Sequence, residues 1–178
     1  MARRNKYVKD YETREQEGGK GKTIIYTGKY YKMDVSEDKR KVVGICYLGF
    51  QIAFLTVFGL MGLLNTESSR KVYVVLPYMF LFLPIYYGLL GTVKLFRTKA
   101  EMTFAEYDQS VLRIRKSAIG MVSLAVAVVV GEVVYLVSNH VTNMASLEYR
   151  FLMGAVFLAV ASFLFLQVQS KYKCVEQN

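Results

Sequence analysis

Residues 117–138 read SAIGMVSLAVAVVVGEVVYLVS, a run of 22 residues in which Glu132 is the only charged side chain. A helix needs about 20 mostly apolar residues to cross a hydrocarbon core roughly 30 Å thick, and helices inside soluble proteins seldom stay free of charge for so long. Three further mostly apolar runs lie at 42–64, 72–96 and 151–168. Together the four runs predict an all-α integral membrane protein with a bundle of four transmembrane helices.

The run 151–168 is the shortest, with 18 residues against a lower limit of about 17. A buried helix of a soluble core is the alternative interpretation for this run, but its three neighbours favour a fourth span. Lipid offers no partners for unpaired backbone groups, and strand-like alternation is absent from all four runs, so helices are the only spanning structure that fits. The order of the runs predicts two helical hairpins.

Basic residues are distributed very unevenly over the segments between the runs. Of the 23 Lys and Arg residues, 20 belong to the N-terminal segment, the middle connection together with the last residues of the run before it, and the C-terminal tail. The two short connections hold the other three, namely Arg70, Lys71 and Arg150. By the positive-inside rule, we expect both termini and the middle connection to lie in the cytoplasm. This predicts a multi-pass protein of the cell (cytoplasmic) membrane.

The formal net charge is +9, and two basic clusters stand next to predicted spans. The residues expected at the membrane surface are Lys39, Arg40, Lys41, Arg113, Arg115 and Lys116. Each gains roughly 1 kcal/mol beside an anionic inner leaflet, so the clusters orient the protein on the lipid bilayer, with specific lipid binding as an alternative. We expect no nucleic-acid binding, because acidic residues are interleaved with the basic ones and no folded reading element follows them.

The chain divides into four parts by composition. Residues 1–22 are rich in both charges and glycine and are expected to be a disordered tail. Residues 23–41 form a cytoplasmic segment next to the membrane, in which β-prone runs at 23–26 and 29–33 flank Thr27-Gly28 and predict a hairpin. The transmembrane domain covers 42–168, and 169–178 form a cytoplasmic tail.

The middle connection carries a helix start signal. Thr103 and Glu106 have the spacing of a capping box, so a helical extension over 104–116 is expected to lead into the third span. We expect this extension and the hairpin to provide the surface for a protein partner. The candidate contact residues are Tyr26, Tyr30, Tyr31, Phe104 and Tyr107.

Glu132 is the only ionisable residue well inside a predicted span, roughly 9 Å below its outer end. A charge there costs several kcal/mol, so the carboxyl group is expected to face protein, to pair or to hold a proton. Counting along antiparallel helices places Thr56 and Tyr78 at the same depth. Gln51 lies nearer the midplane and is expected to bridge helices. These four residues form a possible proton, cation or polar site, with a purely structural role for Glu132 as the alternative.

The sequence offers no signal for catalysis, a cofactor or a metal. The sole histidine, His140, lies in a predicted outer loop without a second ligand nearby. Cys46 and Cys174 both fall on the predicted cytoplasmic side, where reducing conditions disfavour a disulfide. No enzymatic activity is therefore predicted.

Four spans with one carboxyl group give the chain a resemblance to the small multidrug-resistance antiporters. In that family the working glutamate lies on the first helix, whereas Glu132 is on the third and about 40 residues precede the first span. The buried carboxyl group itself is the basis for the alternative function, a small oligomeric proton-coupled transporter that uses Glu132. We favour an accessory or interaction subunit of a larger membrane system, with a protein partner or further copies of the chain in the membrane, and keep transport as the alternative.

Overall fold

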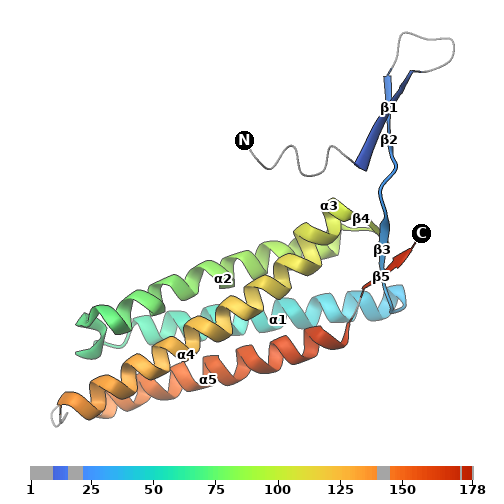
Figure 1. Ribbon diagram of the computed structural model, residues 1–178. Coiled ribbons are helices and arrows are strands. Elements are labelled where there is room, and N and C mark those ends of the chain that lie inside the picture. Colours follow the sequence, from blue (N-terminus) through green and yellow to red (C-terminus); the bar gives the residue numbers. More distant parts are fainter. Residues whose placement is uncertain (1–9, 16–21, 140–144, 173, 178) are drawn as a thin grey trace.

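The computed structural model of the protein describes residues 10–15, 22–139, 145–172 and 174–177. Four long helices lie side by side, and short strands gather at one end of the bundle (Figure 1). His140 and most of the N-terminal tail lie outside the described residues.

The long helices are α1 (Glu37–Gly62), α2 (Val72–Arg97), α4 (Arg113–Asn139) and α5 (Ala145–Lys171). They contain the four apolar runs, and each is long and apolar enough to cross a membrane. Helix α1 packs against α2 and α5, and α4 packs against the same two helices, so the four form a ring in the order α1, α2, α4, α5. The predicted four-helix transmembrane bundle is confirmed.

The outer surface of the bundle is apolar. Only 28% to 33% of each apolar segment is buried inside the protein. Large apolar side chains such as Ile45, Leu60, Met79 and Met153 are more than half exposed. Apolar faces of this extent on every helix match a hydrocarbon surrounding, and the protein is a multi-pass membrane protein.

Side-chain caps define where two of the helices begin and end. The Nη1 atom of Arg40 donates hydrogen bonds to the carbonyls of Thr98 (2.8 Å) and Lys99 (2.6 Å), just past the C-terminal end of α2. A cation suits this position because the end of a helix carries partial negative charge. The predicted capping box is also present: the Thr103 hydroxyl accepts from the Glu106 amide, and the Glu106 carboxylate accepts from the Thr103 amide.

The capping box starts α3 (Phe104–Tyr107), which continues through a wider π-helical turn, Asp108–Leu112, into α4. The chain is therefore helical from Phe104 to Asn139, as predicted from the sequence. The sequence showed no sign of the π-helical turn. Gln169 on α5 contacts it, donating from Nε2 to the carbonyl of Val111 (3.4 Å).

The strands form two small antiparallel sheets. Strand β1 (Tyr11–Glu15) pairs with β2 (Lys22–Tyr26). Strand β3 (Tyr30–Met33) lies between β4 (Glu101–Thr103) and β5 (Cys174–Gln177).

An N-terminal strand pair is thus present, but the predicted pairing of 23–26 with 29–33 is wrong. Both edges of β3 are occupied by strands from the middle connection and the C-terminal segment. Strand β2 pairs instead with residues 11–15, within the stretch for which the sequence predicted disorder. Local propensity identified the strands, but partners so distant in sequence cannot be read from it.

The β4-β3-β5 sheet brings the N-terminal segment, the α2–α3 connection and the C-terminal segment to the same end of the bundle, which we call the sheet end (Figure 1). The α1–α2 connection, the C-terminal end of α4 and the N-terminal end of α5 lie at the opposite end, the loop end. Met33 of β3 and Met102 of β4 are buried in the same apolar core as Ile114 of α4. The sheet is therefore packed onto the bundle rather than loosely attached.

The packing of β5 predicts that the Cys174 thiol is alkylated slowly. Burial raises the pKa of Cys174 from 9.0 to about 11. Only the thiolate reacts with alkylating reagents, so at pH 8 we expect Cys174 in a Cys46→Ala variant to react with iodoacetamide about 100-fold more slowly than in the unfolded chain. The rate should rise steeply as the pH approaches 11. Mass spectrometry of timed samples measures it, and equal rates in the folded and unfolded chain would contradict the packing of β5.

Candidate functional site

A buried carboxyl group holds the loop end together. Glu148, in the first turn of α5, is fully buried. Its Oε1 accepts hydrogen bonds from the backbone amides of Glu67 (2.7 Å) and Ser68 (3.2 Å), and its Oε2 accepts from the Ser68 hydroxyl (2.6 Å). These donors start the short 3-10 turn Ser68–Arg70 of the α1–α2 connection. Glu148 therefore caps this turn and fastens the connection to α5.

Glu132 on α4 lies next to Glu148 and Ser68. Its side chain is fully buried, and neither carboxyl oxygen has a hydrogen-bond partner among the residues that the structure describes. Such a group is unusual, because most buried polar side-chain atoms are paired. The site thus contains one carboxyl group with three donors and, beside it, a second with no donor among the described residues.

Neighbouring residues of α4 complete the site. One turn beyond Glu132, the Tyr135 hydroxyl donates to Oε2 of Glu67 (3.1 Å). One residue before it, a Cβ atom on Gly131 would lie 2.9 Å from the carbonyl oxygen of Tyr73 on α2. Pro77 deprives that carbonyl of its helical donor. Glycine thus permits α2 and α4 to approach closely at the level of Glu132.

The chemistry open to this pair follows from its surroundings. Two carboxylates side by side and out of water repel each other, and one proton or one small cation between them removes the repulsion. Over the ranges that the structure describes, no three His, Cys, Asp or Glu residues are grouped so that they could hold a metal ion. The geometry fits the binding of a proton or a weakly held cation.

The predicted partners of Glu132 are engaged elsewhere. The Thr56 hydroxyl donates to the Ile52 carbonyl of its own helix (2.9 Å) and is exposed on α1. The Tyr78 hydroxyl donates to the Phe58 carbonyl (2.5 Å), joining α2 to α1. Counting residues predicted the depth of these side chains but not the direction in which each helix presents them.

Glu148 was not among the predicted site residues, although the sequence contains a signal for its burial. Glu148 has the spacing i, i+3, i+7 with Phe151 and Ala155, and all three are buried on one face of α5. Extending the periodicity of the fourth run backwards would have placed this carboxyl group in the interior. The role of Ser68 had no comparable signal, since it depends on the path of the α1–α2 connection.

Gln51 forms a separate polar contact far from the carboxyl pair. It is fully buried on α1, and its Oε1 and Nε2 atoms have no hydrogen-bond partner in the described part of the chain. A Cβ atom on Gly88 of α2 would overlap both the Gln51 amide and the Ser117 hydroxyl of α4. Gln51 therefore sits where three helices meet. Along α2, the 15 residues between Tyr73 and Gly88 correspond to about 22 Å, so Gln51 and Glu132 do not form one site.

At the sheet end, the predicted contact residues pack on one another. The Tyr31 ring stacks on Tyr107 with centroids 4.5 Å apart, and Tyr31 also lies 5.9 Å from Phe104. The Tyr26 hydroxyl accepts from the Phe104 amide (3.0 Å), and its ring lies 5.1 Å from Tyr30. The two segments predicted to contact a partner thus form one aromatic cluster.

The basic residues predicted at the membrane surface have different roles. Lys39, Lys41 and Arg115 are exposed, whereas Arg40 caps α2 as described above. Lys116 is exposed and forms an ion pair with Asp108 (3.6 Å). Arg113 is half-buried.

Two regions therefore stand out: the carboxyl pair at the loop end and the aromatic cluster with its sheet at the sheet end. No family model matches the chain, and no curated protein or solved structure matches it.

The two carboxyl groups should differ in their effect on stability. Replacing Glu148 by Ala leaves three donors without an acceptor, so we expect a loss of about 3 kcal/mol in the free energy of unfolding. Glu132→Gln removes no hydrogen bond to a described residue and should change it by less than about 1 kcal/mol. Thermal unfolding of the detergent-purified protein, followed by circular dichroism, compares the two. Equal losses would contradict the assigned roles.

Proposed function

We propose that this protein is an accessory or interaction subunit of a larger membrane system, with the sheet end as its contact surface. The observation that supports this proposal is the β4-β3-β5 sheet, in which three segments distant in sequence form one folded unit outside the spans. A chain that only had to cross the bilayer would need short connections at this end. A folded unit packed on the bundle suits the presentation of a surface to another protein.

The distribution of charge supports a cytoplasmic location for the sheet end. The segments that lead to this end contain 20 of the 23 Lys and Arg residues of the chain. The loop-end connections contain Arg70 and Lys71, and Arg150 follows in the first turns of α5. In the cell membrane, the positive-inside rule then places both termini in the cytoplasm.

The strands at the sheet end offer specific contacts. Strand β5 is at the edge of its sheet, so its outer main-chain groups can pair with an extended segment of a partner. Tyr30 and Val175 are 41% and 52% exposed. The β1–β2 ribbon projects beyond the bundle (Figure 1), and Tyr11 and Ile25 on it are 39% and 38% exposed. A two-stranded ribbon alone is marginally stable in water, and the surface of a partner would stabilise it.

Removing the ribbon tests the interaction. A variant that starts at Lys29 behind a new methionine lacks β1 and β2 but keeps β3 and its neighbours. We expect it to leave the native assembly, seen as faster migration in native gels of membranes dissolved in mild detergent. Glu132→Gln is the control and should migrate as the unaltered chain does. An unchanged mobility of the truncated variant, or an assembly made only of copies of this chain, would refute the proposal.

A second function is favoured by the buried carboxyl pair: a small oligomeric proton-coupled transporter that uses Glu132. A fully buried carboxyl group with no described hydrogen-bond partner, placed beside a second carboxyl group, is suited to take up and release a proton. Ser68 links this site to the α1–α2 connection through its hydrogen bond to Glu148. Occupancy of the site would thereby influence the loop end of the bundle.

Flux measurements separate the two functions. In reconstituted vesicles with an imposed potential, a transporter should acidify the lumen, and Glu132→Gln should abolish this flux because an amide cannot exchange the proton. Thr56→Val is the matched control, since Thr56 lies in a span, is exposed and bonds only within its own helix among the described residues. A pH-sensitive dye inside the vesicles reports the flux. Flux in the unaltered protein that persists in Glu132→Gln would exclude this role.

A further inference from the structure

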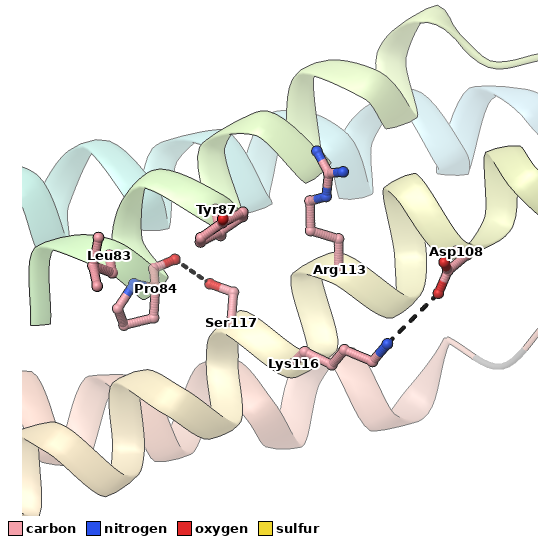
Figure 2. Close-up of a pocket in the computed structure, with 7 residues that line it drawn as sticks. All are labelled: Leu83, Pro84, Tyr87, Asp108, Arg113, Lys116 and Ser117. Atoms are coloured by element: carbon pink, nitrogen blue, oxygen red, sulfur yellow. Dashed lines mark hydrogen bonds and ion pairs between the residues drawn. The ribbon is translucent and has the colours of Figure 1, made fainter. Parts of the chain in front are cut away.

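A cavity of about 340 Å³ lies between α2 and α4, in the half of the bundle nearer the sheet end. Figure 2 shows the seven residues that line it. They are Leu83, Pro84, Tyr87, Asp108, Arg113, Lys116 and Ser117. The volume is within the range of small-molecule sites, which begins at about 300 Å³.

The lining changes character along the helix axis. Leu83 and Pro84 lie at the middle of α2 (Val72–Arg97), the part of the helix that faces the centre of a bilayer. Arg113, Lys116 and Asp108 belong to the start of α4 and the π-helical turn before it, towards the sheet end. The cavity therefore runs from an apolar floor to a charged mouth. A phospholipid changes in the same way along its length, from apolar acyl chains to a charged headgroup.

Arg113 supplies the cation at this mouth. It is half-buried, extends from α4 towards α2 in Figure 2, and forms no hydrogen bond or ion pair with any residue that the structure describes. Lys116 forms an ion pair with Asp108 (3.6 Å). With Arg113, these residues give the lining a formal charge of +1. An arginine in a cavity wall that no described residue pairs with is suited to a phosphate group, whose oxygens match the planar guanidinium.

We propose that this cavity binds the headgroup of an anionic phospholipid, with the phosphate at Arg113 and the upper part of an acyl chain along Tyr87, Leu83 and Pro84. Basic pockets between transmembrane helices are known sites for anionic headgroups. Tyr87 suits the boundary, since its ring is apolar and its hydroxyl is polar. The Ser117 hydroxyl donates to the Pro84 carbonyl, which closes the floor of the cavity to further polar groups. The bound lipid would join α2 to α4 by contacting both helices.

The absence of tryptophan from the chain provides a direct test. Tyr87→Trp places the only tryptophan of the chain in the cavity wall, and Tyr86→Trp places it on the neighbouring residue outside the cavity. Tyr86 is a matched control for Tyr87, because the two side chains are 48% and 47% exposed, respectively. Each variant is reconstituted in phosphatidylcholine vesicles that contain increasing fractions of a lipid brominated on its acyl chains. This brominated lipid is phosphatidylglycerol in one series and phosphatidylcholine in the other. Bromine quenches tryptophan fluorescence on contact.

We expect brominated phosphatidylglycerol to quench Trp at position 87 at an about fivefold lower mole fraction than brominated phosphatidylcholine. At position 86, the two lipids should quench alike. Adding Arg113→Gln to Tyr87→Trp should remove the preference, while quenching by brominated phosphatidylcholine stays unchanged. Unchanged quenching by brominated phosphatidylcholine, together with an unaltered circular dichroism spectrum, would show that the variant is folded and that lipid still enters the cavity.

Three results would overturn the proposal. Equal quenching by the two lipids at position 87 would mean that the cavity does not select anionic lipid. An equal preference at positions 86 and 87 would mean general attraction to the basic surface. Loss of the preference on adding inorganic phosphate or glycerol phosphate to the buffer would identify a water-soluble anion as the occupant.

Discussion

Hydrocarbon offers no hydrogen-bond partner, and this constraint governs the interior of the bundle. Hydroxyl groups within the spans donate to helix carbonyls: Thr92 to Gly88 (3.0 Å), Ser162 to Leu158 (2.6 Å), and Tyr78 across to Phe58 on α1 (2.5 Å). Apolar side chains cover the outside, where no polar group would be satisfied. Against this background, Glu132 and Gln51, whose buried polar atoms have no hydrogen-bond partner among the described residues, mark two places where the spans depart from the rule.

Glu132 and Gln51 have different surroundings, and this difference bears on their function. Gln51 is enclosed at a contact of three helices, where Gly88 leaves just enough room for its amide. Glu132 lies beside a second carboxyl group and a connection between helices, so a change in its charge would act on the contacts that Glu148 makes with Ser68. The carboxyl pair lies near one end of the bundle, where we propose that a proton exchanges with water, whereas Gln51 is enclosed among three helices.

The ends of the bundle are held together in different ways. At the loop end, one carboxyl group gathers the donors of the α1–α2 connection, so a single side chain supports the turn. At the sheet end, main-chain pairing of β3 with β4 and β5 joins three segments, and stacking of Tyr31 on Tyr107 adds the start of the α3–α4 helix. The β4-β3-β5 sheet and the start of the α3–α4 helix therefore form one folded unit at the sheet end.

The sequence by itself determined four features: the four spans, the concentration of basic residues in the segments that lead to one end of the bundle, the capping box at Thr103 and the burial of Glu132. These features depend on composition, on periodicity over a few turns and on the cost of a charge in hydrocarbon, all of which are local. Only the tertiary structure decided that β3 pairs with β4 and β5 and not with β2, that Glu148 and Ser68 are the neighbours of Glu132, and that Thr56 and Tyr78 are not. Those outcomes depend on the rotation of each helix about its axis and on which distant strands meet. Both are set by side-chain packing over the whole bundle, which no single stretch of sequence contains.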